Sequence, residues 1–287
     1  MNKDVLSVIS SSPCKFSKGQ KKIAEYITQN YDKAAFKTAS KLGATVGVSE
    51  STVVRFASDL GYSGYPAMRK AMQEMIKNCL TSVQRIEVAR DLIVEDDIPA
   101  SVLGADIDKI RATLDELDYD SFNKAVNAIV EAEHIYILGL RSSSALANFM
   151  GFYMNLIFPN VHIVNESSSI ALFEQIMRIT EKDAFIAISF PRYPRRTIKA
   201  MQLALDSGAE VIGITDNETS LVAHIANIKL YAKSDMVSFL DSLVAPLSLI
   251  NALIAACANK ADGNLADKFR KLENIWAEYD VYEKNVR

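Results

Sequence analysis

The sequence predicts an all-α domain followed by an α/β domain with a doubly wound, five-stranded parallel sheet. From residue 16 to about residue 80, apolar residues recur at three- and four-residue spacing, which is typical of amphipathic helices. From His134 onward, short apolar runs rich in β-branched residues alternate with helical segments, which is typical of parallel strands covered on both faces. The length of 287 residues also favours two domains.

Charge divides the chain near the same point. Residues 1–80 hold 12 basic and 6 acidic side chains, a net charge of +6, whereas residues 81–287 hold 20 basic and 29 acidic side chains, a net charge of −9. The total of −3 hides this division. A basic module joined to an acidic one favours a nucleic-acid partner for the first module.

Composition excludes several classes of protein. The three cysteines are far apart and odd in number, so we expect neither a disulfide framework nor a zinc ribbon. The three histidines show no metal-ligand spacing, so we expect no metal site. No run reaches the ~18 apolar residues that a membrane helix requires, and the amino terminus does not resemble a signal peptide. These features predict a cytoplasmic protein with no membrane partner.

The helical module begins with a helix that Ser17 is expected to cap and that has Ile23 and Ile27 on its apolar face. The chain then turns after Asn30 and starts again at Thr38. A break near Pro99 is expected between two further helices of the acidic segment 81–132.

The most specific local pattern is TASKLGATVGVSESTVVRFASDLGY, residues 38–62. Gly47 permits a tight turn, Ser49 is placed to cap the second helix, and Gly61 is placed to end it. Within the second helix, apolar residues recur at i, i+3, i+4 and i+7: Val53, Phe56, Ala57 and Leu60. The pattern predicts a helix-turn-helix, which places the amino end of its second helix in the major groove of DNA.

The remaining face of that second helix carries short hydroxyl side chains and an arginine, which allow close approach to DNA and contacts with guanine edges or phosphates. Basic residues to either side are expected to contact flanking phosphates. The candidate DNA-binding residues are Ser49, Ser51, Thr52, Arg55, Lys41, Arg69 and Lys70. The alternative is an ordinary three-helix packing motif with a solvated charged face.

Five repeats of strand and helix follow the acidic segment. The strands are expected within residues 134–139, 160–164, 184–190, 210–215 and 227–232. The longest helix is expected from Ser238 to Ala258, and an amphipathic helix from Leu265 to Tyr279 ends the pattern. The expected division is therefore a DNA-binding domain (1–80), a helical linker (81–125) and an α/β domain with the carboxy-terminal helix (126–287).

Three turns that follow strands carry groups suited to a ligand. In open α/β sheets, ligands bind at the carboxyl ends of strands beside the switch in strand order. Serine hydroxyls and free backbone N–H groups suit a phosphate, and arginines add positive charge. The candidate ligand residues are Arg141, Ser142, Ser143, Ser167, Ser168, Ser189, Arg192 and Arg195. For either serine triplet alone, plain helix capping is an equal alternative. Because GLRSSSALA lacks GxGxxG, we expect no dinucleotide or other cofactor.

The segments FSKGQKKIAEYI, VGVSESTVVRFASDLGY and SGYPAMRKAM resemble the amino-terminal domain of RpiR/MurR-type bacterial transcriptional regulators. That family joins such a domain to a SIS (sugar isomerase) domain, which senses a sugar phosphate. The resemblance extends from residue 16 to about residue 260. It implies a flavodoxin-like α/β domain, binding to double-stranded operator DNA as a homodimer or higher homo-oligomer, and control of carbohydrate catabolism genes.

The SIS resemblance has informative departures. The family pattern GxGxS here reads Gly139-Leu140-Arg141-Ser142-Ser143, so Ser143 matches the phosphate-contacting serine and Arg141 replaces the second glycine. In the third turn, which resembles SxSGxT, Ser189 is retained and Arg192 replaces the glycine, while Pro191 and Pro194 replace the second serine and the threonine. These changes favour arginine in place of hydroxyl groups, for a phosphorylated sugar or a sugar acid.

Two other classes of function stay open at this stage. SIS domains also occur as sugar-phosphate isomerases, in which a carboxylate or histidine moves a proton. Glu166 is the best local candidate for such a base, but it has no recognisable partner, so no catalytic residue is assigned. A scaffold protein would bind no specific operator.

Overall fold

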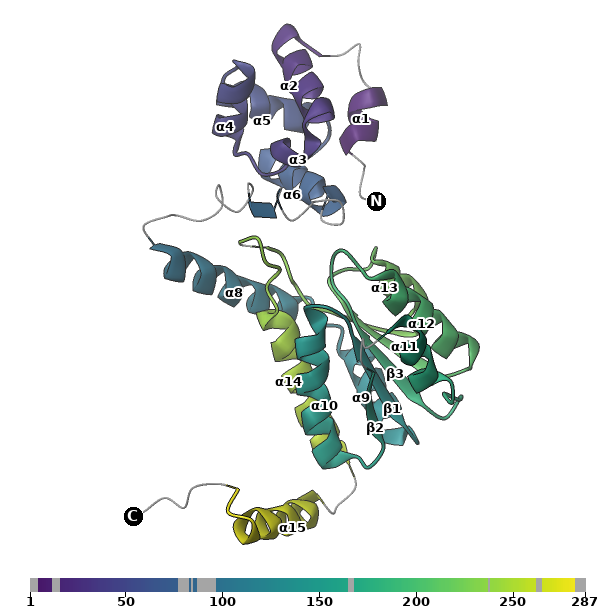
Figure 1. The fold of residues 1–287 in the computed structure, drawn as a ribbon. Helices are drawn as coiled ribbons and strands as arrows, with labels where there is room; N and C mark the ends of the chain where they lie inside the picture. The colour runs from purple at the N-terminus through teal and green to yellow at the C-terminus, as the bar shows by residue number, and fades with distance from the viewer. Residues whose placement is uncertain are drawn as a thin grey trace, which may run out of the picture. The chain divides into compact units, whose positions relative to one another are not determined.

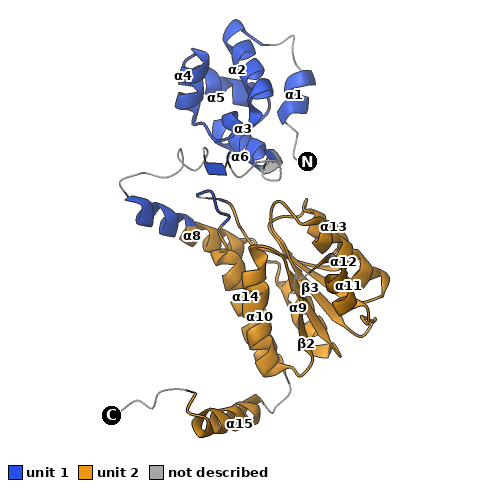
Figure 2. Cartoon of the chain, in the orientation of Figure 1, with its two compact units in different colours: residues 1–105, 236–241 blue, residues 106–235, 242–287 orange. Residues whose placement is uncertain are grey.

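The computed structural model describes residues 5–11, 16–76, 83, 85–86, 97–164, 168–236, 238–261 and 265–281. The chain forms two compact units (Figure 2). Unit 1 contains residues 1–105 and 236–241, and unit 2 contains residues 106–235 and 242–287. A segment from the carboxy-terminal half of the chain therefore belongs to unit 1.

Unit 1 is helical (Figure 1). Its helices are α1 (Val5–Ser11), α2 (Lys18–Gln29), α3 (Tyr31–Ala34), α4 (Ala39–Val46), α5 (Glu50–Asp59), α6 (Tyr65–Ile76) and the first turns of α8 (Ile98–Asp115). Fully buried side chains from α2, α4 and α5 meet in its core, among them Ile23, Ile27, Leu42 and Phe56.

Local caps position the helices of unit 1 as the sequence predicts. The Ser17 hydroxyl accepts a hydrogen bond from the Gln20 backbone N–H, and the Gln20 side chain accepts one from the Ser17 N–H. This reciprocal pair is a capping box, which satisfies two otherwise unpaired donors at the start of α2. The Gln20 side chain also donates to Asp59 Oδ2 at 2.6 Å, which ties α2 to the end of α5.

The turn between α4 and α5 is built around two glycines. Gly47 ends α4 with φ +72°, a left-handed conformation that glycine adopts without steric cost. Gly43 lies against the returning chain, where an added Cβ would be 2.8 Å from the Val48 carbonyl oxygen. The predicted inward residues of α5 are buried, so the helix-turn-helix expected from the sequence is present.

Unit 2 contains a five-stranded parallel sheet with strand order β2-β1-β3-β4-β5 (Figure 1). Its strands are β1 (Ile135–Gly139), β2 (Val161–Val164), β3 (Ala184–Ile188), β4 (Glu210–Thr215) and β5 (Ile228–Tyr231). This is the flavodoxin-like order, in which the strand order reverses between β1 and β3, so that β2 and β3 lie on opposite sides of β1. The predicted doubly wound sheet is thus confirmed.

Helices cover both faces of the sheet. On one face, α9 (Tyr119–Glu131), α10 (Ser143–Ile157) and α14 (Val244–Lys260) pack on alternate strand residues such as Ile137 and Ile186. On the other face, α11 (Ser169–Ile176), α12 (Arg195–Asp206) and α13 (Leu221–Ile225) pack on Tyr136, Phe185 and Val211. Because both faces are covered, the central strands β1 and β3 are buried along their whole length rather than alternating.

One sequence-based boundary was wrong. The long helix α14 begins at Val244, not at Ser238, because residues 236–241 belong to unit 1 and contain an antiparallel bridge between Met236 and Asp241. Pro99 lies in the first turn of α8, where its missing N–H has no intrahelical role, so the expected break near Pro99 falls at the start of this helix. The expected helix before this break lies mostly outside the described residues.

The last described helix is α15 (Leu265–Glu278). Within the described ranges, no single helix is long and apolar enough to cross a membrane; α14 and α15 reach that length and composition only as a pair, bent by 107°.

Candidate functional site

The amino end of α5 presents a cluster of hydroxyl groups. Ser49 caps the helix by accepting from the Thr52 N–H at 3.3 Å. The Ser49 hydroxyl also lies 2.9 Å from the Ser51 hydroxyl and 2.8 Å from the Thr52 hydroxyl. Free backbone N–H groups and small hydroxyls at a helix start suit contact with a phosphate or a base edge.

Arg55 follows Ser51 by one helical turn and is exposed. It forms no ion pair with any other residue that the structure describes. Val54, between these positions on the same side of α5, is 41% exposed. An apolar side chain there suits contact with a thymine methyl group. Val54 was not among the predicted DNA-binding residues, because an apolar side chain gives no polar or basic signal in the sequence. Its position outside the inward-facing i, i+3, i+4, i+7 set was the available sign that it is exposed.

The other candidate DNA-binding residues lie on neighbouring helices. Lys41 on α4 and Lys70 on α6 are exposed, whereas Arg69 is half-buried beside Tyr65. Burial raises the pKa of Tyr65 to about 12, and its hydroxyl donates to the Lys37 carbonyl oxygen at 2.9 Å. This bond fixes α6 to the chain that leads into α4.

In unit 2, the turn after β1 is shaped by a close approach. A Cβ at Gly139 would lie 2.3 Å from the Ser143 carbonyl oxygen, so the first turn of α10 packs directly on the strand end. Arg141 adopts φ +56°, the left-handed conformation that a glycine would take without cost. Ser142 is exposed and Ser143 is buried at the start of α10.

The turn after β3 lies beside the first turn, because Gly139 and Ile188 are register partners in adjacent strands. Arg192 in this turn also adopts a left-handed backbone, with φ +69°. Two buried hydroxyls here, Ser189 Oγ and Thr197 Oγ1, have no hydrogen-bond partner among the residues that the structure describes. Arg195 is exposed at the start of α12 and forms no ion pair among the described residues.

The turn after β2 is only partly described. Glu166 and Ser167 lie outside the described residues. Ser168 caps α11 by accepting from the Ala171 N–H at 2.9 Å. The capping alternative therefore accounts for the Ser168 hydroxyl.

Three groups at the same edge were missed by the sequence analysis. The Tyr193 hydroxyl donates to Asp216 Oδ1 at 2.5 Å, which links the turn after β3 to the turn after β4. Burial and the Asp216 carboxylate raise the pKa of Tyr193, so the phenol stays protonated. After β5, the buried Ser234 hydroxyl has no hydrogen-bond partner in the described part of the chain. The arginine and serine patterns in the sequence could not identify these residues. Their positions at this edge depend on strands that are adjacent only in the folded sheet.

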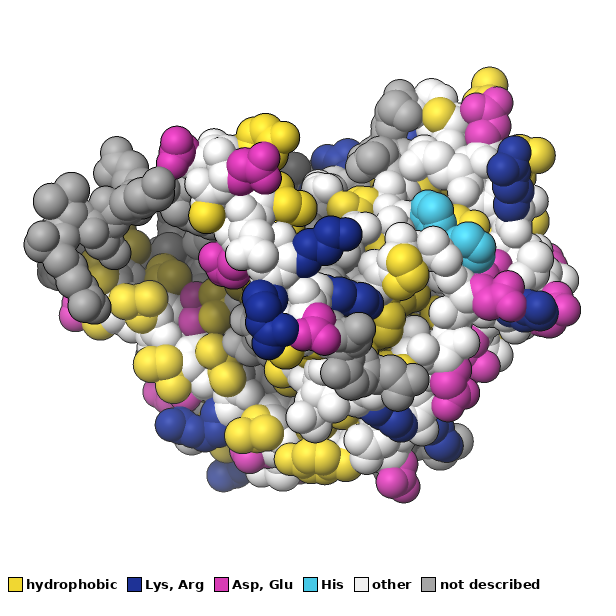
Figure 3. Space-filling model, turned by 90° about the horizontal axis from the view of Figure 1, so that it is seen from below, with side chains coloured by type: hydrophobic (Ala, Val, Ile, Leu, Met, Phe, Trp, Pro, Cys, Tyr) yellow, Lys and Arg dark blue, Asp and Glu magenta, His cyan; other side chains and the backbone are white. Residues whose placement is uncertain are grey.

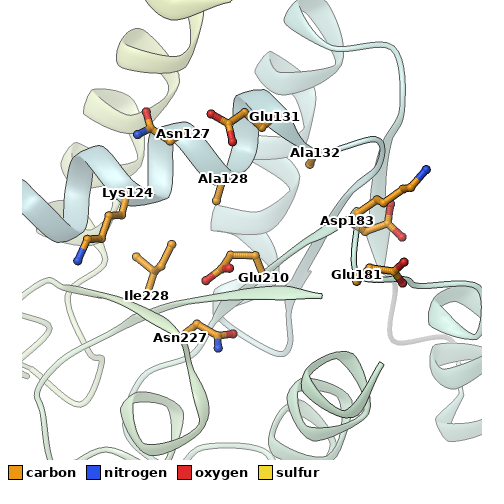
Figure 4. Close-up of a pocket in the computed structure, with 11 residues that line it drawn as sticks. Lys124, Asn127, Ala128, Glu131, Ala132, Glu181, Asp183, Glu210, Asn227 and Ile228 are labelled. Carbon is orange, nitrogen blue, oxygen red and sulfur yellow. The ribbon is translucent and has the colours of Figure 1, made fainter. Parts of the chain in front are cut away.

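The opposite edge of the sheet, at the amino ends of the strands, has a different character. A cavity of about 560 Å³ lies there, lined by α9 and by the starts of β3, β4 and β5 (Figure 4). The Asp183 carboxylate in its lining accepts hydrogen bonds from the backbone N–H groups of His134 and Thr180, so it connects the chain segments that precede β1 and β3. Seen from this side, side chains of both charges are interspersed, and two histidines lie together (Figure 3).

The unpartnered hydroxyls distinguish the two edges. In unit 2, as far as the structure describes it, the buried hydroxyls without a partner are Ser189, Thr197 and Ser234. All three lie at the carboxyl edge, where the two left-handed arginines also lie, and none lines the cavity at the opposite edge. Because buried polar groups normally have partners, these three hydroxyls are candidates for contact with a ligand.

Two family descriptions match the chain. Residues 3–78 match the helix-turn-helix domain of the rpiR family, and residues 128–256 match the SIS domain.

Relatives and solved structures agree with these matches. HexR of Pseudomonas aeruginosa is 26% identical over 99% of this chain and 100% of its own, and HexR of Escherichia coli is 25% identical over 96% and 95%. Both are named HTH-type transcriptional regulators.

Among solved structures, the sugar isomerase domain of an RpiR transcription factor from Sphaerobacter thermophilus has a TM-score of 0.59 and 27% identity, and it covers 62% of this chain and 99% of its own. The Vibrio vulnificus NanR protein, solved in complex with ManNAc-6P, has a TM-score of 0.56 and 20% identity over 96% of this chain and 98% of its own, a likeness of fold.

The order of the two matched domains, the helix-turn-helix of unit 1 and the parallel sheet of unit 2 agree with one another. The chain belongs to the RpiR family of transcriptional regulators, in which a helix-turn-helix domain is joined to a SIS domain.

Proposed function

We propose that the chain is a DNA-binding transcriptional regulator that senses a phosphorylated sugar or a sugar acid at the carboxyl edge of its SIS sheet. The observation that carries the sensing function is the set of orphaned hydroxyls, Ser189, Thr197 and Ser234, beside two arginines with left-handed backbones. Hydroxyls and guanidinium groups are the donors that phosphate and carboxylate groups accept best.

The proposal assigns DNA binding to residues 1–80, with α5 in the major groove and Ser49, Ser51, Thr52 and Arg55 near base edges. Lys41, Arg69 and Lys70 contact flanking phosphates. Residues 81–125 join this domain to the effector-binding residues 126–287. The protein acts in the cytoplasm as a homodimer or higher homo-oligomer, because helix-turn-helix proteins read paired half-sites.

The effector site uses Arg141, Ser142 and Ser143 from the first turn. It uses Ser189, Arg192 and Arg195 from the third, while Ser167 and Ser168 contribute from the second. NanR, a protein of the same fold, is described with a phosphorylated amino sugar, which supports this class of effector. The relatives that are named transcriptional regulators support a role without catalysis. The effector is therefore released from the site chemically unchanged.

Two measurements on the full-length chain test the proposal. Selection from random double-stranded DNA should enrich a sequence made of two related half-sites. A thermal-shift screen against phosphorylated sugars and sugar acids should find a stabilising compound, since a ligand at 100 times its dissociation constant adds about 2.7 kcal/mol. Failure to enrich any DNA sequence would contradict the DNA-binding function. Chemical turnover of the stabilising compound would contradict a function limited to sensing.

A further inference from the structure

Two of the three histidines of the chain meet at the amino edge of the sheet in unit 2 (Figure 3). His134 directly precedes β1, and His162 lies on β2, the strand at one end of the sheet. Nδ1 of His134 is 3.2 Å from Nε2 of His162, so one ring donates a hydrogen bond to the other. Among the residues that the structure describes, neither ring has another hydrogen-bond partner.

Neighbouring residues restrain both rings and leave them accessible. Tyr136 and His162 are register partners in β1 and β2, and their rings stack with centroids 4.9 Å apart. The Asp183 carboxylate accepts a hydrogen bond from the His134 backbone N–H at 3.1 Å. His162 is exposed and His134 is half-buried, so a solute can reach the pair from solvent.

The separation of the two ring nitrogens suits a metal ion. Zn²⁺ binds histidine nitrogens at about 2.0–2.1 Å with tetrahedral angles, which places two such nitrogens ~3.3 Å apart. The nitrogens of His134 and His162 are already 3.2 Å apart. A small rotation of the rings that turns both lone pairs toward one point therefore suffices to bind an ion. Imidazole nitrogen is also a ligand that zinc, copper and nickel ions prefer.

The charges at this edge favour a cation. The cavity beside the pair is lined by two basic side chains, Lys124 and Lys182, and by four acidic ones, Glu131, Glu181, Asp183 and Glu210. Asp183 connects the two features, because it lines the cavity and also accepts from the His134 backbone. The excess of carboxylates attracts a divalent cation, and salt weakens this attraction.

We propose that His134 and His162 form a binding site for a divalent transition-metal ion of the zinc type, chelated by Nδ1 of His134 and Nε2 of His162. The described residues contain no group of three or more histidine, cysteine or carboxylate side chains placed to hold an ion, so water fills the remaining coordination positions. The ion takes the place of the shared proton, which moves to the outer nitrogen of its own ring. The bound ion links β1 to the edge strand β2.

This site is separate from the proposed effector site. The histidine pair lies at the amino edge of the sheet, whereas the orphaned hydroxyls lie at the carboxyl edge. Metal binding requires neither DNA nor an effector, so it can be measured whether or not the proposed function holds. The sequence gives no metal-ligand spacing here, because the two histidines are 28 residues apart and meet only through the pairing of β1 with β2.

The test is isothermal titration calorimetry of the full-length chain, without an affinity tag, at a slightly alkaline pH where imidazole is neutral. Zn²⁺ should bind, whereas Mg²⁺, which prefers oxygen ligands, should not bind at the pair. His162→Gln keeps a hydrogen-bonding side chain but removes one ligand. It should weaken Zn²⁺ binding at least about tenfold, because chelation makes the second contact intramolecular.

The third histidine supplies the matched control. The His224 ring contacts the Ser220 carbonyl oxygen on α13, away from the pair, so His224→Gln should bind Zn²⁺ as wild type does. Zn²⁺ held elsewhere in the chain, by a cysteine for example, would be retained in both variants. Wild-type affinity for Zn²⁺ in the His162→Gln variant would therefore overturn the proposal.

Nuclear magnetic resonance of the ring nitrogens gives a readout that a change in folding does not imitate. Because the chain has three histidines, Zn²⁺ should shift the ring ¹⁵N signals of His134 and His162 and leave those of His224 in place. Unchanged ring signals of the pair, or no binding of Zn²⁺ at millimolar concentration, would also overturn the proposal.

Discussion

Arg141 and Arg192 adopt a backbone conformation that costs a residue with a side chain about 1–2 kcal/mol relative to the right-handed one. Each follows the carboxyl end of a strand, and the two strands are neighbours in the sheet. Both positions correspond to glycines of the SIS pattern, and here each left-handed backbone carries a guanidinium side chain. Strain of this kind is concentrated at binding sites, where the side chain has a use that offsets the cost.

Replacing Arg192 with glycine should separate stability from binding. Arg192→Gly relieves the left-handed strain, so its melting temperature should equal or exceed that of wild type. The loss of one charge-assisted hydrogen bond, worth about 1.5–3 kcal/mol, should weaken effector binding by about tenfold or more. Arg192→Ala is the control: it should lose the same affinity but be less stable than Arg192→Gly. Effector binding that is unchanged in Arg192→Gly would exclude this side chain from the site.

Arg55 is the residue on α5 expected to read a base. Arg55→Ala should cost about 1–3 kcal/mol on the preferred sequence, measured by fluorescence anisotropy. Lys70→Ala should instead weaken binding to all sequences by a similar factor and reduce the salt dependence, because a phosphate contact carries no sequence information. If Arg55→Ala lost the same factor on every sequence, Arg55 would be a phosphate contact.

At the scale of elements, the angle between α4 and α5 depends on Gly43. An added Cβ would meet the Val48 carbonyl oxygen at 2.8 Å, and a backbone atom cannot move aside as a side chain can. Gly43→Ala should therefore destabilise unit 1 by about 1–3 kcal/mol in spite of the better helix propensity of alanine.

Gly104 on α8 provides the matched comparison, since an added Cβ there would meet no atom within 4 Å. Gly104→Ala should stabilise the chain by about 0.5–1 kcal/mol, the ordinary difference between the two residues in a helix. Chemical denaturation of both variants measures the contrast. Equal effects would show that the turn is not tightly constrained at Gly43.

Elements whose signals are local could be predicted from the sequence. Ser17 and Ser49 cap their helices because the capping atoms lie within three residues, and the strands of unit 2 follow from short apolar runs. The start of α14 could not be predicted, because residues 236–241 leave the helical pattern through contacts in unit 1. Nor could the bond between Tyr193 and Asp216, whose residues are 23 apart in the chain and meet only because β3 and β4 are adjacent.

At the scale of the whole molecule, residues 236–241 give a physical reason to expect coupling. The chain leaves the carboxyl edge after β5, passes Ser234, and then contributes Asp241 to unit 1, where its carboxylate accepts from Arg85 at 2.8 Å. Met236 packs against the apolar core of the same unit. A ligand that orders Ser234 at the carboxyl edge therefore acts close in sequence to residues 236–241, which belong to unit 1.

Linkage makes this coupling measurable from both sides. If the effector changes the affinity for operator DNA by some factor, DNA must change the affinity for the effector by the same factor, commonly 5- to 150-fold.

Asp241→Asn removes the charge that pairs with Arg85, so this coupling factor should move toward one, while DNA alone and effector alone each bind as in wild type. Glu133→Gln is the control, because it breaks an exposed ion pair with Lys182 in unit 2 and should leave the factor unchanged. Titrations of DNA with and without effector, and of effector with and without DNA, give the two factors. An Asp241→Asn variant that retains the wild-type factor would show that the segment 236–241 does not carry the coupling.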